Sequence, residues 1–207
     1  MTGPDNDRLD SARLAEAGTL FRGAVDELIA TLGRLDESHL AAVAGLAADV
    51  QESWRRGGKF MVCGNGGSAA DSQHIVAELV GRFLAERPGY AALALTANTS
   101  TLTAVGNDYG YDHIFSRQVQ ALGGADDVLL VISTSGNSAN CLTAVEAARA
   151  HGMKVHWFLG RDGGQLLPML DGALVAPSDS TPKIQEVHIT MGHLLCMILE
   201  RWVMAND

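Results

Sequence analysis

The residues best suited to chemistry in this sequence are His74 and Glu78, together with His193 much later in the chain. On a helix, residues four positions apart share a face, so His74 and Glu78 could bind one metal ion or pair with each other. His193 lies in a segment rich in Ile, Met and Leu, where a histidine is often a hydrogen-bonded core residue. The helical repeat favours Glu186, seven residues earlier, as its partner, and Gln185 lies about 80° further round the helix. Periodicity alone therefore leaves the partner of His193 open.

A glycine-rich loop precedes the segment that carries His74. Asn65, Gly66 and Gly67 follow a short apolar run and lead into a helical pattern. Glycines let backbone N–H groups approach an anion at the N-terminus of the helix. The loop lacks both the G-x-G-x-x-G spacing and the lysine of a P-loop, and on its own it also fits a plain strand-to-helix turn.

A second loop is rich in hydroxyl groups, which it carries on Ser133, Thr134, Ser135 and Ser138. It follows another apolar run and precedes a helix predicted to begin near Ala139. Four hydroxyl donors and the N–H groups of a helix N-terminus can satisfy the oxygens of a phosphate monoester without Lys or Arg. The alternative is a helix cap with additional serines, although capping needs only one hydroxyl.

Each of these loops is expected to connect a strand to a helix. The hydrophobic pattern of the sequence predicts a fold that is built from such connections. Short apolar runs alternate with helical segments, which is typical of a parallel sheet with helices on both faces. We expect an α/β fold with about five strands, whose ligands bind at the carboxyl ends of the strands. The predicted strands are Phe60 to Cys63, Ala91 to Leu95, Val128 to Ile132, Val155 to Leu159 and Ala173 to Ala176.

Helical spacing of apolar residues also predicts helices at the two ends of the chain. Segments Leu14 to Leu32 and Leu40 to Trp54 are expected to form an N-terminal helical hairpin, and the last helix is expected to run from Thr181 to about Met204. No linker or repeat divides the sequence. We therefore predict a single domain over 1–207, with the hairpin in 1–57 and the α/β core and C-terminal helix in 58–207.

Composition excludes several classes of protein. The 207 residues include 15 Lys and Arg against 24 Asp and Glu, a formal net charge of −9, so no broad basic face is expected for nucleic acid or an anionic membrane. The polar N-terminus and the lack of an apolar stretch of roughly 18 residues argue against a secretory signal or a membrane span. The three cysteines are widely spaced, which argues against a disulfide framework or a zinc knuckle. We expect a cytoplasmic protein.

Six blocks of the sequence, in consistent order from about Lys59 to Glu200, closely resemble the phosphoheptose isomerases of the sugar-isomerase (SIS) domain superfamily. The blocks are Cys63-Gly64-Asn65-Gly66-Gly67-Ser68-Ala69-Ala70-Asp71, Gln73-His74 through Ala77-Glu78-Leu79-Val80-Gly81-Arg82, Gly106-Asn107-Asp108-Tyr109-Gly110, Phe115-Ser116-Arg117-Gln118, Ile132-Ser133-Thr134-Ser135-Gly136-Asn137-Ser138 and Ile184-Gln185-Glu186-Val187-His188-Ile189.

The resemblance implies a set of site residues. It implies one zinc ion per subunit, held by His74, Glu78, Gln185 and His193. It implies substrate contacts at Asn65, Gly66, Gly67, Glu78, Asn107, Asp108, Ser133, Thr134, Ser135, Ser138 and Gln185. It also implies a homotetramer whose sites lie between subunits and which the N-terminal helices help to build.

The implied reaction converts sedoheptulose 7-phosphate to a D-glycero-D-heptose 7-phosphate through an enediol, the first step of nucleotide-activated heptose biosynthesis. Such a reaction needs a base that moves a proton between C1 and C2, for which we predict Glu78. A second group must move a proton between the two oxygens, and His193, with an ordinary pKa of about 6.5, suits that role.

Two other functions are compatible with the same fold. One is a non-enzymatic SIS-domain partner of the bacterial replication initiator, but such proteins lack the catalytic Glu and last-helix His that are present here as Glu78 and His193. The other is isomerisation of a different ketose phosphate. A sugar-phosphate-sensing transcription regulator would need a DNA-binding module, and no basic recognition helix is present.

Overall fold

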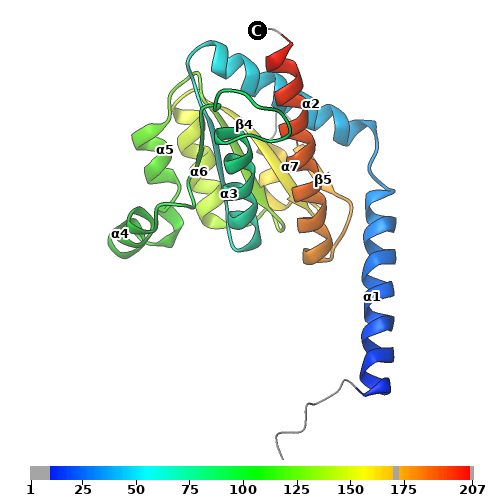
Figure 1. Ribbon diagram of the computed structural model, residues 1–207. Helices are drawn as coiled ribbons and strands as arrows, with labels where there is room; N and C mark the ends of the chain where they lie inside the picture. The colour runs from blue at the N-terminus through cyan, green and yellow to red at the C-terminus, as the bar shows by residue number, and fades with distance from the viewer. Residues whose placement is uncertain (1–9, 170–172, 206–207) are drawn as a thin grey trace, which may run out of the picture.

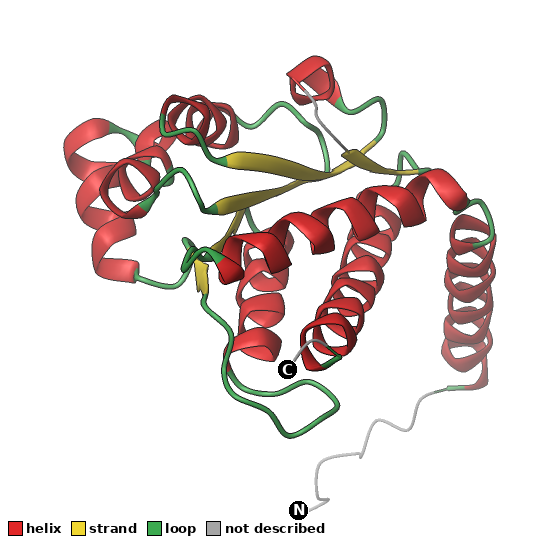
Figure 2. Ribbon diagram, turned by 90° about the horizontal axis from the view of Figure 1, so that it is seen from above, coloured by secondary structure: helices red, strands yellow, loops and turns green. Residues whose placement is uncertain are grey.

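The computed structural model describes residues 10–169 and 173–205, and these residues build one parallel sheet covered by helices on both faces (Figures 1 and 2). The five strands lie in the order β2-β1-β3-β4-β5. They are β1 (Phe60–Gly64), β2 (Ala92–Ala94), β3 (Val128–Ser133), β4 (Lys154–Gly160) and β5 (Ala173–Ala176). All five predicted strands are confirmed, although β2 at the sheet edge is one residue shorter at each end than predicted.

The strands alternate their side chains between two helical layers, as a sheet buried on both faces requires. Phe60, Val62 and Leu130 pack in the core beneath α2 (Glu37–Arg55), α3 (Gly67–Val80) and α7 (Thr181–Met204). Met61 and Leu129 pack on the other face, beneath α5 (Ser116–Leu122) and α6 (Ala139–Ala150). Three further helical elements are α4 (Thr99–Tyr109) and the short turns η1 (Tyr111–His113) and η2 (Gly164–Met169).

The two N-terminal helices are present as predicted, but they diverge instead of packing as a hairpin (Figure 1). The apolar face of α2, with Val43 and Leu46, is buried in the core against α7 and the sheet. α1 (Ser11–Leu32) is capped by Asp10, whose carboxylate accepts a hydrogen bond from Arg13 N at 2.7 Å. The later part of α1 contacts α7, and its N-terminal part extends away from the body of the protein. The main apolar face of α2 is therefore occupied by the core and does not pack along α1.

The predicted starts of two helices that border the candidate site are confirmed. α6 begins at Ala139, directly after the hydroxyl-rich loop, and α7 runs from Thr181 to Met204 with Pro182 in its first turn. No helix in the described ranges 10–169 and 173–205 is long and apolar enough to cross a membrane.

Candidate active site

The glycine-rich loop leaves β1 at the carboxyl edge of the sheet and enters α3. Gly66 has a φ of +58°, which glycine adopts readily, and α3 has no side-chain cap at this end. Gly67 lies against the amide of Gln185 from α7, so closely that a Cβ at this position would overlap that amide. The lack of a side chain at Gly67 thus leaves room for the Gln185 amide between the first turn of α3 and the first turns of α7.

Asn65 is held in place by side chains from two other elements. Its amide donates to Asn140 Oδ1 at 2.8 Å and accepts from Asn140 Nδ2 at 2.9 Å, so each amide satisfies the other. The hydroxyl of Tyr111 donates to Asn65 Oδ1 at 3.1 Å. Sequence reasoning missed Asn140 and Tyr111 as partners, although Asn140 follows the hydroxyl-rich loop by only two residues.

The hydroxyl-rich loop turns sharply between β3 and α6. The hydroxyl of Ser133 accepts a hydrogen bond from Gly136 N at 3.1 Å, and that of Ser135 accepts from Asn137 N at 3.3 Å. Gly136 has a φ of +63°, and a Cβ there would overlap the carbonyl of Gly163. The loop is thus shaped by its own hydroxyls and by a glycine that no other residue can replace.

Ser138 occupies the N-cap position of α6 without making a side-chain cap hydrogen bond. Capping therefore does not explain this serine, which was the alternative to phosphate binding. Instead, the loop and the glycine-rich loop share a small cavity of about 50 Å³ at the carboxyl edge of the sheet. Its lining residues are Asn65, Ser68, Ile132, Ser133, Thr134, Ser138 and Gln185.

The two candidate histidines meet where α3 and α7 lie side by side. His74 Nε2 is 2.8 Å from His193 Nε2, and the two rings are arranged edge to face with centroids 5.0 Å apart. Glu78 Oε1 is 3.5 Å from His74 Nε2. Phe83, which sequence reasoning missed, stacks its ring on His193 at a centroid distance of 5.9 Å. Two imidazoles and a carboxylate thus converge on one partly exposed point.

The partner of His193 is therefore His74. Neither Glu186 nor Gln185, which the sequence analysis considered, contacts His193. Glu186 pairs with Lys183, whose Nζ donates to Glu186 Oε1 at 3.1 Å and to the carbonyl of Ala24 in α1. Gln185 lies against Gly67, at the start of α3. Gln185 therefore belongs to the cavity between the two loops, about two helical turns of α7 from His193.

Asn107 and Asp108 lie at the end of α4 and are exposed to solvent. Asn107 Nδ2 donates to Asp108 Oδ1 at 2.8 Å. In the described part of the chain, no hydrogen bond joins either residue to the other predicted site residues. The structure of this single chain therefore does not bring them to the cavity or to the histidines.

The donor types at the histidine pair are those that zinc favours, two imidazole nitrogens and a carboxylate oxygen. Two nitrogens bound to one tetrahedral zinc would be roughly 3.3 Å apart, from bond lengths of about 2.0–2.1 Å, and here they are at hydrogen-bond distance. Among the residues that the structure describes, no group of three or more His, Cys, Asp or Glu side chains is arranged to hold a metal ion. The chemistry of the donors fits zinc, and their present spacing is that of a hydrogen-bonded pair.

Burial changes the ionisation of several groups around the site. It lowers the pKa of His188 in α7 to about 4, and His188 Nε2 donates to the carbonyl of Leu159 at 2.8 Å. His188 is therefore a neutral core histidine, unlike the accessible His193 on the same helix. Burial also raises the pKa of Asp71 in α3 and raises that of Cys196 in α7 to about 12.

Comparison with known proteins places this arrangement in context. The sequence matches the SIS domain family over residues 25–159. It is 58% identical to a phosphoheptose isomerase of Rhodospirillum rubrum over 159 residues, which cover 77% of this chain and 85% of the relative. It is 50% identical to a phosphoheptose isomerase of Roseiflexus over 183 residues, covering 87% of this chain and 93% of the relative.

A solved structure agrees with the sequence comparison. The phosphoheptose isomerase GmhA of Neisseria gonorrhoeae superposes with a TM-score of 0.84 at 42% identity, covering 89% of this chain and 99% of the other.

Proposed function

Because the chain belongs to the phosphoheptose isomerases of the SIS domain family, we propose that Glu78 and His193 carry out its aldose–ketose isomerisation. The protein is an enzyme that interconverts sedoheptulose 7-phosphate and a heptose 7-phosphate in heptose biosynthesis. The observation that supports the residue assignment is the convergence of His74, Glu78 and His193 from helices that are far apart in the sequence. A non-enzymatic role as a partner of the replication initiator is not favoured.

The proposed mechanism assigns one role to each side chain. Glu78 takes a proton from C1 of the ketose, which leaves an enediol across C1 and C2, and then returns the proton to C2. The carboxylate is about three-quarters buried, which limits its contact with water during this transfer. His193 passes a proton between the C1 and C2 oxygens, so the ketone becomes a hydroxyl and the C1 hydroxyl becomes the aldehyde.

We place the phosphate in the cavity between the two loops. Ser133, Thr134 and Ser138 line it, and the N-terminus of α6 adds N–H groups and a partial positive charge. This arrangement lets an acidic protein hold an anion with hydroxyl and amide donors. Asn65, fixed by Asn140 and Tyr111, would position the sugar beside the loop.

Zinc is part of this proposal, with His74, Glu78 and His193 as ligands of one ion per subunit. When bound, zinc would act as a Lewis acid that stabilises negative charge developing on the sugar oxygens. Gln185 contacts Gly67 here, so it would join the other three ligands only in a different side-chain conformation. Elemental analysis of the purified wild type and of His193→Ala tests the ligand set, and equal zinc content in the two proteins would remove His193 from it.

The proposed assembly is a homotetramer, which α1 supports. This helix exposes Leu14, Leu20, Phe21 and Ile29, each more than 60% accessible in the isolated chain. Such a row of large apolar side chains on one extended helix is typical of a surface that a second copy of the chain covers. The proposed location, the cytoplasm, is consistent with the lack of a membrane-spanning helix in the described ranges.

One experiment tests the reaction directly. Purified protein is incubated with sedoheptulose 7-phosphate, and the C1 and C2 signals are followed by NMR. We expect loss of the ketose C2 signal and growth of an aldose C1 signal, with fructose 6-phosphate turned over much more slowly. Failure to convert sedoheptulose 7-phosphate, or equal turnover of a shorter ketose phosphate, would overturn the substrate assignment.

A further inference from the structure

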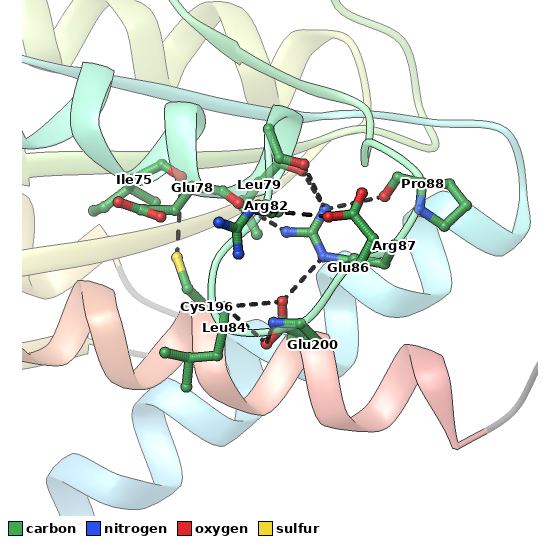
Figure 3. A network of polar contacts seen from close by, with 12 residues as sticks. Ile75, Glu78, Leu79, Arg82, Leu84, Glu86, Arg87, Pro88, Cys196 and Glu200 are labelled. Carbon is green, nitrogen blue, oxygen red and sulfur yellow. Dashed lines mark hydrogen bonds and ion pairs between the residues drawn. The ribbon is translucent and has the colours of Figure 1, made fainter.

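The segment between α3 and β2, residues 81–91, has no regular secondary structure, yet it runs beside the proposed base. Its backbone N–H and C=O groups need partners other than a helix or a sheet. Two buried charged side chains supply many of them. They are Arg87, from the segment itself, and Glu200, from α7, with side chains 2% and 6% exposed (Figure 3).

The guanidinium of Arg87 binds carbonyl groups at the end of α3 and in the segment that follows it. Its Nη2 donates to the carbonyl of Glu78 at 2.7 Å, and its Nη1 donates to those of Leu79, Gly81 and Pro88 at 2.9, 3.2 and 3.0 Å. The last carbonyls of a helix have no partner within it, and a cation at this end is favourable. Arg87 thus terminates α3 by holding the backbone of the very residue proposed as the base.

Glu200 binds N–H groups of the same segment from the opposite side. Its carboxylate accepts from Leu84 N and Ala85 N, both at 3.1 Å to Oε2, and Oε1 lies 3.3 Å from Arg87 Nε. The contact with Arg87 is an ion pair without the alignment of a hydrogen bond. Leu84 directly follows Phe83, whose ring stacks on His193. Glu200 therefore fixes the backbone that presents Phe83 to His193.

Arg87 and Glu200 link the helices that carry the two proposed catalytic residues. Glu78 is on α3 and His193 on α7, and Glu200 lies seven residues after His193, on the same face of α7. Arg87 contacts the backbone of Glu78 and the side chain of Glu200, so it connects the two helices just beyond the site (Figure 3). The ring of Tyr90, 4.0 Å below the guanidinium, closes the site of Arg87 from another side.

From these contacts we infer that Arg87 and Glu200 are positioning residues for the isomerisation, which set the direction of the Glu78 carboxylate relative to His193. This inference rests on the proposed function, in which Glu78 is the base. An offset of about 1 Å in a reacting group can reduce a rate by about a hundredfold. The phosphate cavity lies at the other end of α3, so substrate binding should change much less than turnover.

Two variants separate positioning from simple stability. Arg87→Lys keeps the charge, but one ammonium cannot reach four carbonyls and the carboxylate together. The double variant Arg87→Met with Glu200→Leu replaces both buried charges with apolar side chains, so that neither charge is left in the interior without its partner. The double variant keeps the test valid should Arg87→Lys fail to fold.

The measurement is kcat and KM for sedoheptulose 7-phosphate per folded protein, with the folded fraction determined by circular dichroism. For both variants we expect kcat to fall by about tenfold or more, while KM changes by less than about threefold. Glu200→Gln, which keeps an oxygen to accept from the backbone, should retain more activity than Glu200→Leu. The matched control is Lys59→Met, which breaks a partly buried ion pair with Asp127 at the opposite edge of the sheet. It should lower the melting temperature and leave kcat unchanged.

The outcomes distinguish this inference from the proposed function. Unchanged kcat in both the folded Arg87→Lys protein and the folded double variant, beside an inactive Glu78→Gln, would overturn the positioning role alone. A loss of activity that only follows the unfolded fraction would overturn it too. If Glu78→Gln itself keeps full turnover, the assignment of the base fails, and the positioning role fails with it.

Discussion

The two edges of the parallel sheet use polar residues in opposite ways. At the amino edge, charges are paired: Asp127 accepts from Lys59 N and Gly124 N, both at 2.8 Å, and from Lys59 Nζ at 2.6 Å. Asp49 binds His156 Nε2 at 2.8 Å and also pairs with Lys154. Burial raises the pKa of Asp49, but its bonds to Lys154 and His156 outweigh burial and hold that pKa below its usual value.

At the carboxyl edge, the polar groups that line the cavity are neutral hydroxyls and amides. These groups can form further hydrogen bonds with a ligand in the cavity. Ser138 at the start of α6 makes no cap hydrogen bond, and α3 begins without a side-chain cap. The difference teaches that polar groups fully satisfied within the chain stabilise the fold, whereas a site keeps donors that a ligand can complete. Changes at the two edges should therefore alter different measurements.

The largest expected effect is at the carboxyl edge. Glu78→Gln keeps the size of the side chain but removes its basicity, so kcat should fall by at least about a hundredfold, in the range typical of a lost general base. The melting temperature should stay within a few degrees of wild type. Steady-state kinetics with sedoheptulose 7-phosphate and thermal unfolding provide the two measurements.

The control for this variant is Glu86→Gln, because the Glu86 side chain is 90% exposed and lies in the neighbouring segment. It should leave both kcat and the melting temperature unchanged. Turnover by Glu78→Gln close to that of wild type would mean that the base lies elsewhere.

The second effect is at the amino edge, and it should appear in stability alone. Asp127→Asn leaves a nearly buried amide facing the N–H groups of Lys59 and Gly124, one of which loses its acceptor. We expect a loss of about 2 kcal/mol in the free energy of unfolding, with kcat unchanged. Urea denaturation measures the first quantity.

Asp126→Asn is the matched control for this position, because Asp126 is half exposed and its contact with Arg56 is 3.7 Å long. Its effect on the free energy of unfolding should stay below about 0.5 kcal/mol. Equal losses of unfolding free energy in the two variants would show that the hydrogen bonds of Asp127 stabilise the fold no more than an exposed carboxylate does.

The third effect is on substrate binding. Ser133→Ala combined with Ser135→Ala removes two hydroxyls that shape the phosphate loop, and we expect KM to rise by about tenfold or more, which corresponds to about 1.4 kcal/mol. Zinc content should not change. Ser100→Ala, on the exposed surface of α4, should leave KM as it is. If the double variant bound the sugar phosphate as well as wild type does, the phosphate would have to lie outside this loop.

The smallest effect concerns His188, a buried histidine on the same helix as His193, whose Nε2 donates to the carbonyl of Leu159. Its pKa falls from about 6.5 in the unfolded chain to about 4 in the fold. As the pH is lowered, the histidine is therefore protonated in the unfolded state before it is protonated in the folded state. Its contribution to stability is fully present above pH 6.5 and is lost as the pH falls towards 4. Between pH 6.5 and 5.5 it should remove about 1 kcal/mol from the free energy of unfolding.

Denaturation of wild type and His188→Gln at these two pH values isolates this contribution. Glutamine does not titrate and can still donate to the carbonyl of Leu159, so the difference in stability between the two proteins should shrink as the pH falls. A constant difference between pH 6.5 and 5.5 would show that His188 is not the group responsible.

Much of the fold was predictable because its determinants are local. The run Val128 to Ile132 is short, apolar and bounded by polar residues, which is typical of a buried strand, and β3 has these residues buried throughout. The hydroxyl-rich loop follows it directly, so its place at the carboxyl edge was fixed by chain order. The divergence of α1 from α2 was not predictable, because an apolar helix face does not specify which other face it will contact.

The sequence by itself determined the parallel α/β fold, the places of the glycine-rich and hydroxyl-rich loops, and the presence of His74, Glu78 and His193 on helices. Only the tertiary structure decided that His193 meets His74, 119 positions away, while Glu186 turns to Lys183 and Gln185 to Gly67. It likewise decided that Arg87 and Glu200 are buried together beside Glu78, the proposed base. The physical reason is that helix periodicity fixes which residues share a face, whereas the neighbour of that face depends on how two helices pack on the sheet.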